Sequence, residues 1–438
     1  MLKVYFLMFL ITNFLKVISY KFHENDQILP CLQGDNQFDN LVENNLIMPE
    51  AQIYKKHVSF FNENFVYTKL FDKNFNKINN YEWTKEKYFK KNFYKFYDHV
   101  SMKDKLQKKK DRKQLLQEMF TKKHKIERRI PFIIDSDIGM FPDDPVALAI
   151  MHELQSQGKI YILATVGSTR YESVARNLYV MNNFMNHSNT PIGTTKDPNA
   201  YTDPAHSQAW TEYIYQKYYS IIESNEDVPD AVSTYRMALS NAPDRSVVIL
   251  SIGHLTNLAN LLNSKSDRFS KMTGKALVKR KVREVVLMGG QFPDGLEWNI
   301  QKDVHSARYF TTNWPGKLTF VGSEVGNVTC GKKYQKKLSI RNPVMAMTLF
   351  GYEKYHSYWG CFDAVAALIA GEETTSLYCA VYGNIQINAQ GANHWVHAPK
   401  TALRYNAQRY VKLKSGNTDL KTRLFISKRI DDFLPNIN

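Results

Sequence analysis

From Ile130 onward, short β-rich segments alternate with segments that have helical spacing. Strands are predicted at IPFIIDS, KIYILATVG, TPIGTT, RSVVILSIG, VREVVLMGG and KLTFVGSEVG. Helices are predicted at DDPVALAIMHEL, YESVARNLYVMNNFMN, TNLANLLNS, KDVHSARYFTTNW and FDAVAALIAG. This alternation predicts an α/β fold, with a mostly parallel, doubly wound sheet that has helices on both faces. In such a sheet, ligands bind outside the carboxyl ends of the strands.

The amino terminus has the pattern of a secretory signal peptide. Residues 1–19 contain a basic start at Lys3, an apolar run and small residues before Tyr20. The apolar run is shorter than the roughly 20 residues that span a bilayer, so we expect no stable membrane insertion. An uncleaved membrane anchor is the alternative. We expect a secreted, extracellular protein whose mature chain begins near Tyr20.

Residues 20–129 form an extension that is rich in Lys, Asn and aromatic residues and has no clear period. The chain has a net charge of +16, and residues 101–130 alone hold twelve Lys or Arg against four Asp or Glu. Clustered basic residues attract phosphates and sulfates, so weak polyanion binding through residues 101–130 is one interpretation. We favour the other, a solvated and partly disordered extension. Residues 130–438 form the predicted α/β domain.

Secretion would place the four cysteines in an oxidising compartment, where they can form disulfides. The sequence leaves open which of the three connectivities is used among Cys31, Cys330, Cys361 and Cys379. Two triplets match the N-glycosylation acceptor pattern, at Asn186 and Asn327. We therefore expect a glycoprotein with glycan at one of these two asparagines.

Carboxylates are crowded at the end of the first predicted strand, at Asp135, Asp137, Asp143 and Asp144. Like charges this close repel and raise one another's pKa, and a bound cation is the usual compensation. Asp143 and Asp144 also precede a helix, so a purely capping role is the structural alternative. Other polar groups at predicted strand ends or helix starts are Gly253–Asn257, Gly289, Gly290, Glu297, Asn299 and Asp363.

Five elements, in this order, resemble the inosine/uridine-preferring nucleoside hydrolases, and most closely their secreted branch. The resemblance covers the chain from Ile130 to the carboxyl terminus. The elements are Asp-x-Asp-x-Gly with a following Asp pair (Asp135–Asp144), Gly-x-Leu-Thr-Asn-Leu-Ala (Gly253–Ala259), Met-Gly-Gly (Met288–Gly290), Glu-x-Asn (Glu297–Asn299) and an Asp that heads a helix (Asp363).

The resemblance implies a bound Ca²⁺ ion, which takes oxygen ligands. The implied ligands are the side chains of Asp137, Asp144 and Asp363 and the backbone carbonyl of Thr256. Asp135 would lie behind these ligands and orient them. The implied reaction cleaves the N-glycosidic bond of a small-molecule ribonucleoside to ribose and free base, with a metal-bound water as nucleophile and Asp137 as the base.

Substrate contacts are implied at Asp143, Ser168, Met288, Glu297, Asn299 and Phe362. Two of these residues depart from the family pattern. Ser168 stands where many members have an Asn that contacts the sugar. Phe362 stands where the best-described members have a His that protonates the leaving base, and Phe supplies no proton. The turn Met140-Phe141-Pro142 is also unusually apolar.

Alternative functions remain open from the sequence. The main alternative is a non-catalytic, secreted descendant that binds a nucleoside or a sugar. A second is a polyanion-binding protein whose activity lies in the extension. An aspartyl phosphatase also begins with Asp-x-Asp after a strand, but it requires Thr or Val where Gly139 stands. The sequence leaves open the base preference and whether the chain forms a homo-oligomer.

Overall fold

The computed structural model describes residues 109–434, apart from 115–116, 119–128, 140, 203–213, 215–216, 332–342, 345–359, 373–375, 399–407 and 417. The predicted signal peptide (residues 1–19) and most of the predicted extension lie outside the described residues. The first strand begins at Ile130, where the α/β domain was predicted to start.

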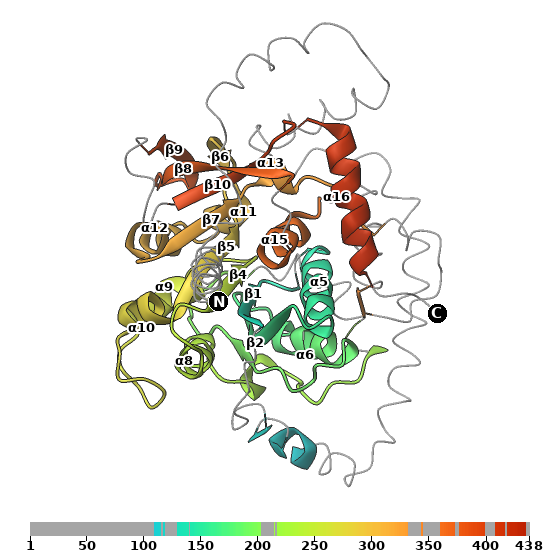
Figure 1. Cartoon of the computed structure of the whole chain (residues 1–438). Coiled ribbons are helices and arrows are strands. Elements are labelled where there is room, and N and C mark those ends of the chain that lie inside the picture. Colours follow the sequence, from blue (N-terminus) through green and yellow to red (C-terminus); the bar gives the residue numbers. More distant parts are fainter. Residues whose placement is uncertain are drawn as a thin grey trace, which may run out of the picture. The chain divides into compact units, whose positions relative to one another are not determined.

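The described residues contain one ten-stranded sheet (Figure 1). Its strand order is β3-β2-β1-β4-β5-β7-β10-β8-β9-β6. The strands from β3 to β10 in this order pair in parallel, and β8, β9 and β6 add an antiparallel edge. The strand bounds are β1 Ile130–Ser136, β2 Ile160–Gly167, β3 Ile192–Thr194, β4 Val247–Ser251, β5 Val282–Met288, β6 Asp294–Leu296, β7 Lys317–Val321, β8 Tyr378–Ile387, β9 Ala392–His397 and β10 Gln408–Leu413.

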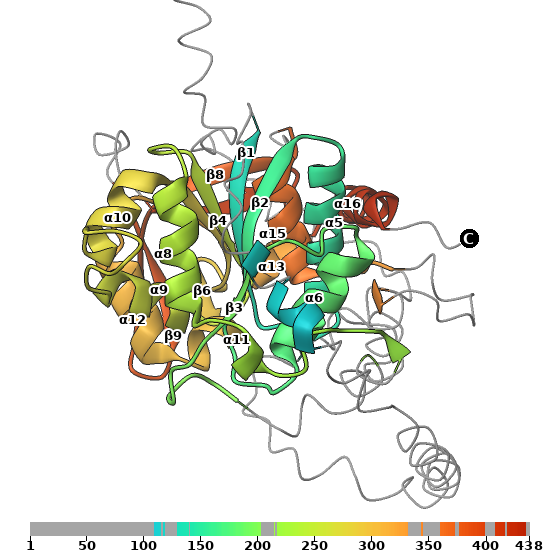
Figure 2. The same cartoon turned by 90° about the horizontal axis from the view of Figure 1, so that it is seen from below.

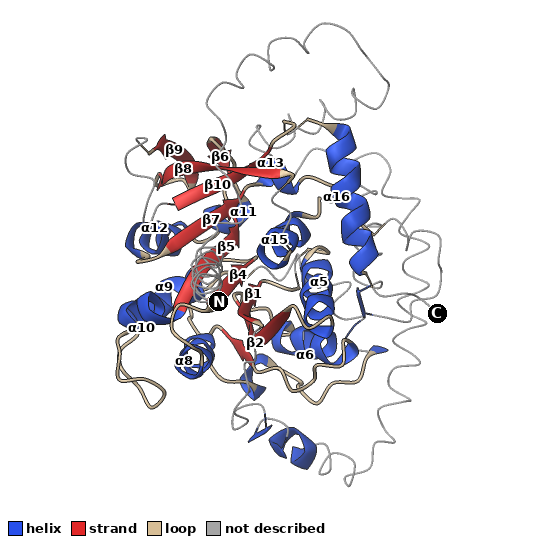
Figure 3. Cartoon of the chain, in the orientation of Figure 1, coloured by secondary structure: helices blue, strands red, loops and turns tan. Residues whose placement is uncertain are grey.

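Helices cover both faces of the sheet (Figures 2 and 3). One face carries α5 Asp144–Ser156, α6 Val174–Phe184, α15 Phe362–Gly371 and α16 Leu420–Phe433. The other carries α8 Ala231–Asn241, α9 Thr256–Asn263, α10 Gly274–Lys281 and α12 Val304–Asn313. Short helices are η2 Asn225–Asp227, α11 Trp298–Gln301 and α13 Ser323–Gly326.

Strand β1 shows why the sheet forms at the centre of the domain. Phe132 and Ile134 are fully buried in the core under α5 and α15, and Ile133 is fully buried in the core on the opposite face. A strand that is buried on both faces has a continuous apolar sequence, as parallel strands between two helix layers do. The predicted fold class is therefore confirmed.

The predicted elements all occur, with one correction. The segment KLTFVGSEVG was predicted as a strand throughout, but β7 ends at Val321 and the short helix α13 follows. Gly322 interrupts the apolar run, and the backbone N–H groups of Val325 and Gly326 bond back to its carbonyl at 3.1 Å. The turn therefore lies at the carboxyl edge of the sheet, where Val321 pairs with Met288 at the end of β5.

The strand order places a topological switch between β1 and β4. The chain moves outward from β1 through β2 to β3, then returns to pair β4 on the other side of β1. The loops after β1 and β4 therefore leave the sheet in opposite directions and open a crevice, which is where doubly wound sheets bind ligands. Asp137 follows β1, and Gly253 and His254 follow β4.

A disulfide joins Cys330 to Cys361, with 6.0 Å between the two Cα atoms. It ties the segment after α13 to the residue before α15, whose first turn carries Asp363. Cys31 lies outside the described residues. Within the described part of the chain, no helix is both long and apolar enough to cross a membrane.

Candidate functional site

Asp135 is the last carboxylate inside β1, and it is fully buried. Its Oδ2 accepts hydrogen bonds from the hydroxyl of Tyr235 at 2.8 Å and from Nδ2 of Asn257 at 3.1 Å. Burial raises the pKa of Asp135 to about 7, against the lowering effect of these hydrogen bonds. Asn257 also donates to the carbonyl of Gly167 at 3.0 Å. Asp135 therefore joins the ends of β1, β2 and α9 behind the crevice.

Asp137 and Asp144 face the crevice from the turn after β1 and from the first residue of α5. The hydroxyl of Ser136 donates to Oδ1 of Asp144 at 2.6 Å. Oδ2 of Asp144 and Oδ2 of Asp137 are both buried without a hydrogen-bond partner. Burial, and then the neighbouring carboxylates, raise the pKa of both side chains well above the usual range.

Three buried carboxylates come together at the N-terminal ends of α5 and α15. One oxygen from each of Asp143, Asp144 and Asp363 lies within 4.8 Å of the others. The backbone N–H of Asp363 donates to Oδ2 of Asp143 at 3.2 Å, which joins the starts of the two helices. Burial, and then the charges of Asp143 and Asp144, raise the pKa of Asp363. The group of three does not include Asp137, although Asp137 was the predicted ligand and Asp143 the predicted sugar contact.

Thr256 begins α9, and its side chain bonds to a carboxylate outside the proposed cation group. Its hydroxyl donates to Oδ2 of Asp303, the N-terminal cap of α12. Only the backbone carbonyl of Thr256 is therefore left for a cation, as predicted, and this ligand assignment stays a prediction.

Glu297 and Asn299 are held rigidly at the start of α11. The carboxylate of Glu297 caps this helix, with Oε1 accepting from the N–H of Asn299 at 2.8 Å and Oε2 from the N–H of Gly290 at 3.1 Å. Nδ2 of Asn299 donates to the carbonyl of Met288 at 3.2 Å. Burial raises the pKa of Glu297 to about 7. Asn299 and Met288, both predicted site residues, are thus in direct contact.

Ser168 follows β2 and is fully buried, and its hydroxyl is one of the hydrogen-bonding groups that oppose the rise in the pKa of Asp135 caused by burial. It lies beside Gly253, where an added Cβ would come within 2.7 Å of the backbone nitrogen of Asp137 and would also meet the Ser168 hydroxyl. Only glycine lets the loop after β4 approach the loop after β1 this closely. Ser168 therefore reaches the same crevice as Asp137.

His254 was not singled out by the sequence, although it lies within the Gly-x-Leu-Thr-Asn element. Its Nδ1 lies 3.6 Å from Oδ2 of Asp137, and both ring nitrogens are buried without hydrogen-bond partners. Burial lowers the pKa of His254 to about 4. Its ring packs on Tyr201, with 5.0 Å between the centroids.

An aromatic group was also missed, because two of its members come from loops without periodicity. Tyr201 and Phe141 both contact Trp298 edge-on, with centroid separations of 6.0 and 5.5 Å. The amine of Lys302 lies 4.0 Å from the centroid of the Trp298 ring and 5.4 Å from that of Tyr201. We call Phe141, Tyr201, Trp298 and Lys302 the aromatic rim. Phe141 belongs to the apolar turn noted in the sequence.

Phe362 is the first residue of α15, and it is half-buried. An added Cβ at Gly326 would come within 2.9 Å of Cδ1 of Phe362, and one at Gly360 would come within 3.1 Å of Cε1. Two glycines therefore make room for this ring next to Asp363. A phenyl ring at this position can pack against a substrate but cannot donate a proton.

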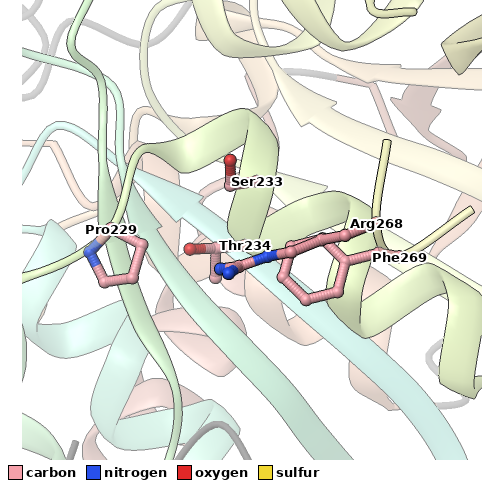
Figure 4. Close-up of a pocket in the computed structure, with 5 residues that line it drawn as sticks. All are labelled: Pro229, Ser233, Thr234, Arg268 and Phe269. Carbon is pink, nitrogen blue, oxygen red and sulfur yellow. The ribbon is translucent and has the colours of Figure 1, made fainter. Parts of the chain in front are cut away.

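A separate pocket of about 420 Å³ lies at the start of α8, lined by Pro229, Ser233, Thr234, Arg268 and Phe269 (Figure 4). None of the predicted site residues lines it. The chemistry therefore belongs to the carboxylate crevice rather than to this pocket.

The carboxylates of the crevice fit a hard divalent cation. Two buried carboxylate oxygens lack any hydrogen-bond partner, and three carboxylates meet within 4.8 Å. The donors are oxygens from Asp side chains, which suit Ca²⁺ and Mg²⁺ rather than the softer metals that favour His or Cys. Without a cation, mutual repulsion of these charges would oppose folding.

Comparisons with known proteins agree with this fold. The profile of a family described as inosine-uridine preferring nucleoside hydrolase matches residues 132–418. The type III effector protein XopQ, complexed with adenosine diphosphate ribose, is similar in structure, with a TM-score of 0.52, 14% identity and coverage of 74% of this chain and 99% of XopQ.

Two nucleoside hydrolases are similarly related. A purine-preferring ribonucleoside hydrolase from Gardnerella vaginalis gives a TM-score of 0.50 at 17% identity and covers 69% of this chain and 98% of its own. An inosine-uridine preferring nucleoside hydrolase from Bacillus anthracis gives a TM-score of 0.50 at 13% identity. The match covers 70% of this chain and 100% of that hydrolase. The comparison with curated proteins found no match.

Proposed function

The chain belongs to the inosine-uridine preferring nucleoside hydrolase family, and from that premise we propose that it is a Ca²⁺-dependent hydrolase of ribonucleosides. The observation that carries this proposal is the meeting of Asp143, Asp144 and Asp363, together with the unpartnered oxygens of Asp137 and Asp144. This arrangement would supply a cation site and, beside it, a carboxylate oxygen that has no hydrogen-bond partner.

The ion would be held by Asp137, Asp144, Asp363 and the carbonyl of Thr256. Asp143 is close enough to the group to contribute as well. When bound, Ca²⁺ supplies a positive charge that polarises water and ribose hydroxyls. Asp135, which Tyr235 and Asn257 hold by hydrogen bonds, would lie behind these ligands and orient them.

Asp137 would act as the base. Its Oδ2 is buried and has no hydrogen-bond donor, so it is available to accept a proton from the attacking water. The water oxygen then bonds to C1′ of the sugar while the C1′–N bond breaks and the base departs with the bonding electrons. The transition state resembles an oxocarbenium ion, which the surrounding carboxylates stabilise.

Glu297, Asn299, Ser168 and Asp143 would hold the ribose. The Glu297 carboxylate is fixed by backbone N–H groups of α11 and of Gly290, so its position is set before substrate arrives. Preorganised polar groups of this kind orient C1′ towards the water, and orientation alone can contribute several kcal/mol.

The test is incubation of the purified protein with a nucleoside panel, measuring ribose release with and without chelator. Release should require metal, and re-addition of Ca²⁺ to chelated protein should restore it. Metal-independent ribose release would contradict the proposed cation site. No release from any riboside by Ca²⁺-loaded protein would contradict the enzymatic function.

The second candidate is a binding protein without catalysis. Phe362 favours it, since it lacks a proton for the departing base. XopQ, which shares the fold, was obtained in complex with adenosine diphosphate ribose. Calorimetric binding of a nucleoside or of adenosine diphosphate ribose, without ribose release, would favour this candidate over the enzyme.

Secretion belongs to the same proposal. Asn186 is exposed after α6, whereas Asn327 is half-buried between α13 and the Cys330–Cys361 disulfide. Asn186 is therefore the better glycan acceptor of the two. N-terminal sequencing of secreted material should begin near Tyr20, and glycosidase digestion should reduce the mass of the wild type but not of Asn186→Gln. A mature chain that begins at Met1 would contradict a cleaved signal.

A further inference from the structure

Lys302 lies one helical turn after Trp298, and this spacing places its side chain over the Trp298 ring. Its backbone N–H donates to the carbonyl of Trp298 at 3.0 Å, one turn earlier. Residues separated by four positions lie on the same side of a helix, so the lysine side chain extends across the indole. The amine lies 4.0 Å from the Trp298 centroid. This cation–π contact fixes the charge without neutralising it.

Lys302 carries its charge beside the two rings of Tyr201 and Trp298. Among the described residues, the amine forms no ion pair with a carboxylate, although the crevice holds several of them. The neighbouring Asp303 is bonded instead to Thr256 and to the N–H of Ser306. Lys302 also contacts Tyr201, whose ring packs on His254, and Nδ1 of His254 lies 3.6 Å from Oδ2 of Asp137. Lys302 is therefore available to an anion that enters the crevice.

The orientation of a bound ribose determines which of its substituents would reach Lys302, and therefore which anion the lysine would bind. The 2′ and 3′ hydroxyls are adjacent, so a cation held at Asp143, Asp144 and Asp363 would draw both of them to that group. The remaining hydroxyl, at C5′, would then point to the other polar group of the crevice, Glu297 and Asn299. A substituent on the 5′ oxygen would continue past these residues to Trp298 and Lys302.

We propose that the site takes ribosides with a phosphate on the 5′ oxygen, and that Lys302 is the residue that selects for this phosphate. The inference rests on the proposed function for the orientation of the ribose. Lys302 is a specificity residue here, since it touches substrate far from the C1′–N bond. The reaction itself is unchanged: water replaces the base at C1′, Asp137 accepts one proton, and ribose 5-phosphate is the sugar product.

The experiment compares inosine with inosine 5′-monophosphate on the Ca²⁺-loaded full chain. The variants are Lys302→Met, which keeps the stem over Trp298 but removes the charge, and Lys302→Arg, which keeps the charge. Lys275→Met, on the exposed side of α10, is the matched control for a lost surface charge. Each is assayed for kcat/KM on both substrates and for calorimetric binding of ribose 5-phosphate against ribose.

Lys302→Met should lower kcat/KM on the monophosphate by about tenfold, which corresponds to one lost charged contact. The same variant should change kcat/KM on inosine by less than about twofold. Lys302→Arg should retain most of the preference, and Lys275→Met all of it. Added salt should weaken only the phosphorylated substrate.

Equal losses on both substrates, or no change in their ratio, would overturn the role of Lys302. Failure of ribose 5-phosphate to bind more tightly than ribose would also overturn it. A protein that hydrolyses neither substrate yet binds ribose 5-phosphate through Lys302 would refute the enzymatic function but support this inference. The two ideas therefore fail separately.

Discussion

The hydroxyl of Ser136 donates a 2.6 Å hydrogen bond to Oδ1 of Asp144 and leaves Oδ2 of Asp144 buried and unpartnered. The same hydroxyl accepts the backbone N–H of Ile138 at 3.0 Å, which closes the turn after β1. One serine thus both shapes the loop and fixes the rotamer of a proposed cation ligand. Residues that orient metal ligands in this way commonly change metal affinity when they are replaced.

Ser136→Ala should weaken Ca²⁺ binding by about 10- to 100-fold, because Asp144 loses the hydrogen bond that directs Oδ2 towards the ion. Calorimetric titration of chelated protein with Ca²⁺ measures this. The control is Ser156→Ala at the end of α5, where the hydroxyl bonds to the His152 carbonyl and to Nε2 of His187 and contacts none of the proposed ligands. Unchanged affinity in Ser136→Ala would show that Asp144 is not a ligand.

Asp137→Ala should abolish detectable ribose release and also reduce the Ca²⁺ that co-purifies. Loss of a general base alone typically costs about 10²–10⁴-fold, and here a proposed ligand is lost with it. Turnover and metal content are measured on the same preparation. Asp244→Ala is the control, since that carboxylate lies on the surface and pairs with Arg280 and Lys281. Wild-type turnover in Asp137→Ala would refute its role.

The sequence predicted the parts of the site that belong to regular elements. The bounds of β1 and α15 agree with the segments IPFIIDS and FDAVAALIAG. These two elements carry Asp135 and Asp363, and the carboxyl ends of parallel strands necessarily meet at one edge of the sheet. The gathering of several carboxylates at one edge of the sheet could therefore be expected from the order of strands and helices, whereas the meeting of Asp143, rather than Asp137, with Asp144 and Asp363 could not.

The aromatic rim and His254 could not be predicted in the same way. Tyr201 comes from an irregular loop, and its contact with His254 depends on where that loop lies after β3. The antiparallel strands β8 and β9 were also missed. The apolar pattern of β8 is broken at Gly383, where an added Cβ would come within 2.7 Å of the Trp395 ring. That glycine is required by a partner strand that local sequence does not reveal.

Glu324 predicts a pH-dependent stability. Its Oε2 accepts from the N–H of Phe292 at 3.0 Å, and Oε1 is buried without a partner. Burial raises its pKa from 4.5 to about 7, against the lowering effects of the Phe292 hydrogen bond and the Arg423 charge, while Glu297 raises it further. A folded-state pKa above the unfolded value means that the folded protein retains a proton between these two values. Stability is therefore lost as pH rises from 4.5 to about 7.

Glu324→Gln should remove this loss, because the amide keeps an acceptor for Phe292 and carries no charge. Its free energy of unfolding relative to the wild type should rise by about 1–3 kcal/mol between pH 4.5 and pH 8. Denaturant unfolding at the two pH values measures the difference. Glu226→Gln is the control, since that side chain is 85% exposed and should show no such trend. A parallel shift in both variants would assign the effect to other groups.

Phe362 predicts the order of substrates. The crevice offers carboxylates for the sugar and a base for the water, but the residue beside Asp363 offers a phenyl ring instead of a proton donor. Protonation of a leaving group typically contributes about 10²–10⁴-fold. Nitrophenyl riboside, whose leaving group needs no proton, should therefore be cleaved much faster than inosine or uridine. Aromatic stacking should favour purine over pyrimidine ribosides, and deoxyribosides should be poor because they lack a hydroxyl for the cation and Asp143.

Phe362→His tests directly whether the missing proton donor causes this order of substrates. Histidine is smaller than phenylalanine and fits the space that Gly326 and Gly360 leave for the ring. The variant should raise kcat/KM on inosine by about tenfold or more while leaving nitrophenyl riboside nearly unchanged, since only inosine gains from a donated proton. Phe362→Leu, which removes the ring and adds no donor, separates loss of stacking from gain of acid. Equal wild-type rates on inosine and nitrophenyl riboside would mean that another residue protonates the base, and Phe362 would then have no part in setting the substrate order.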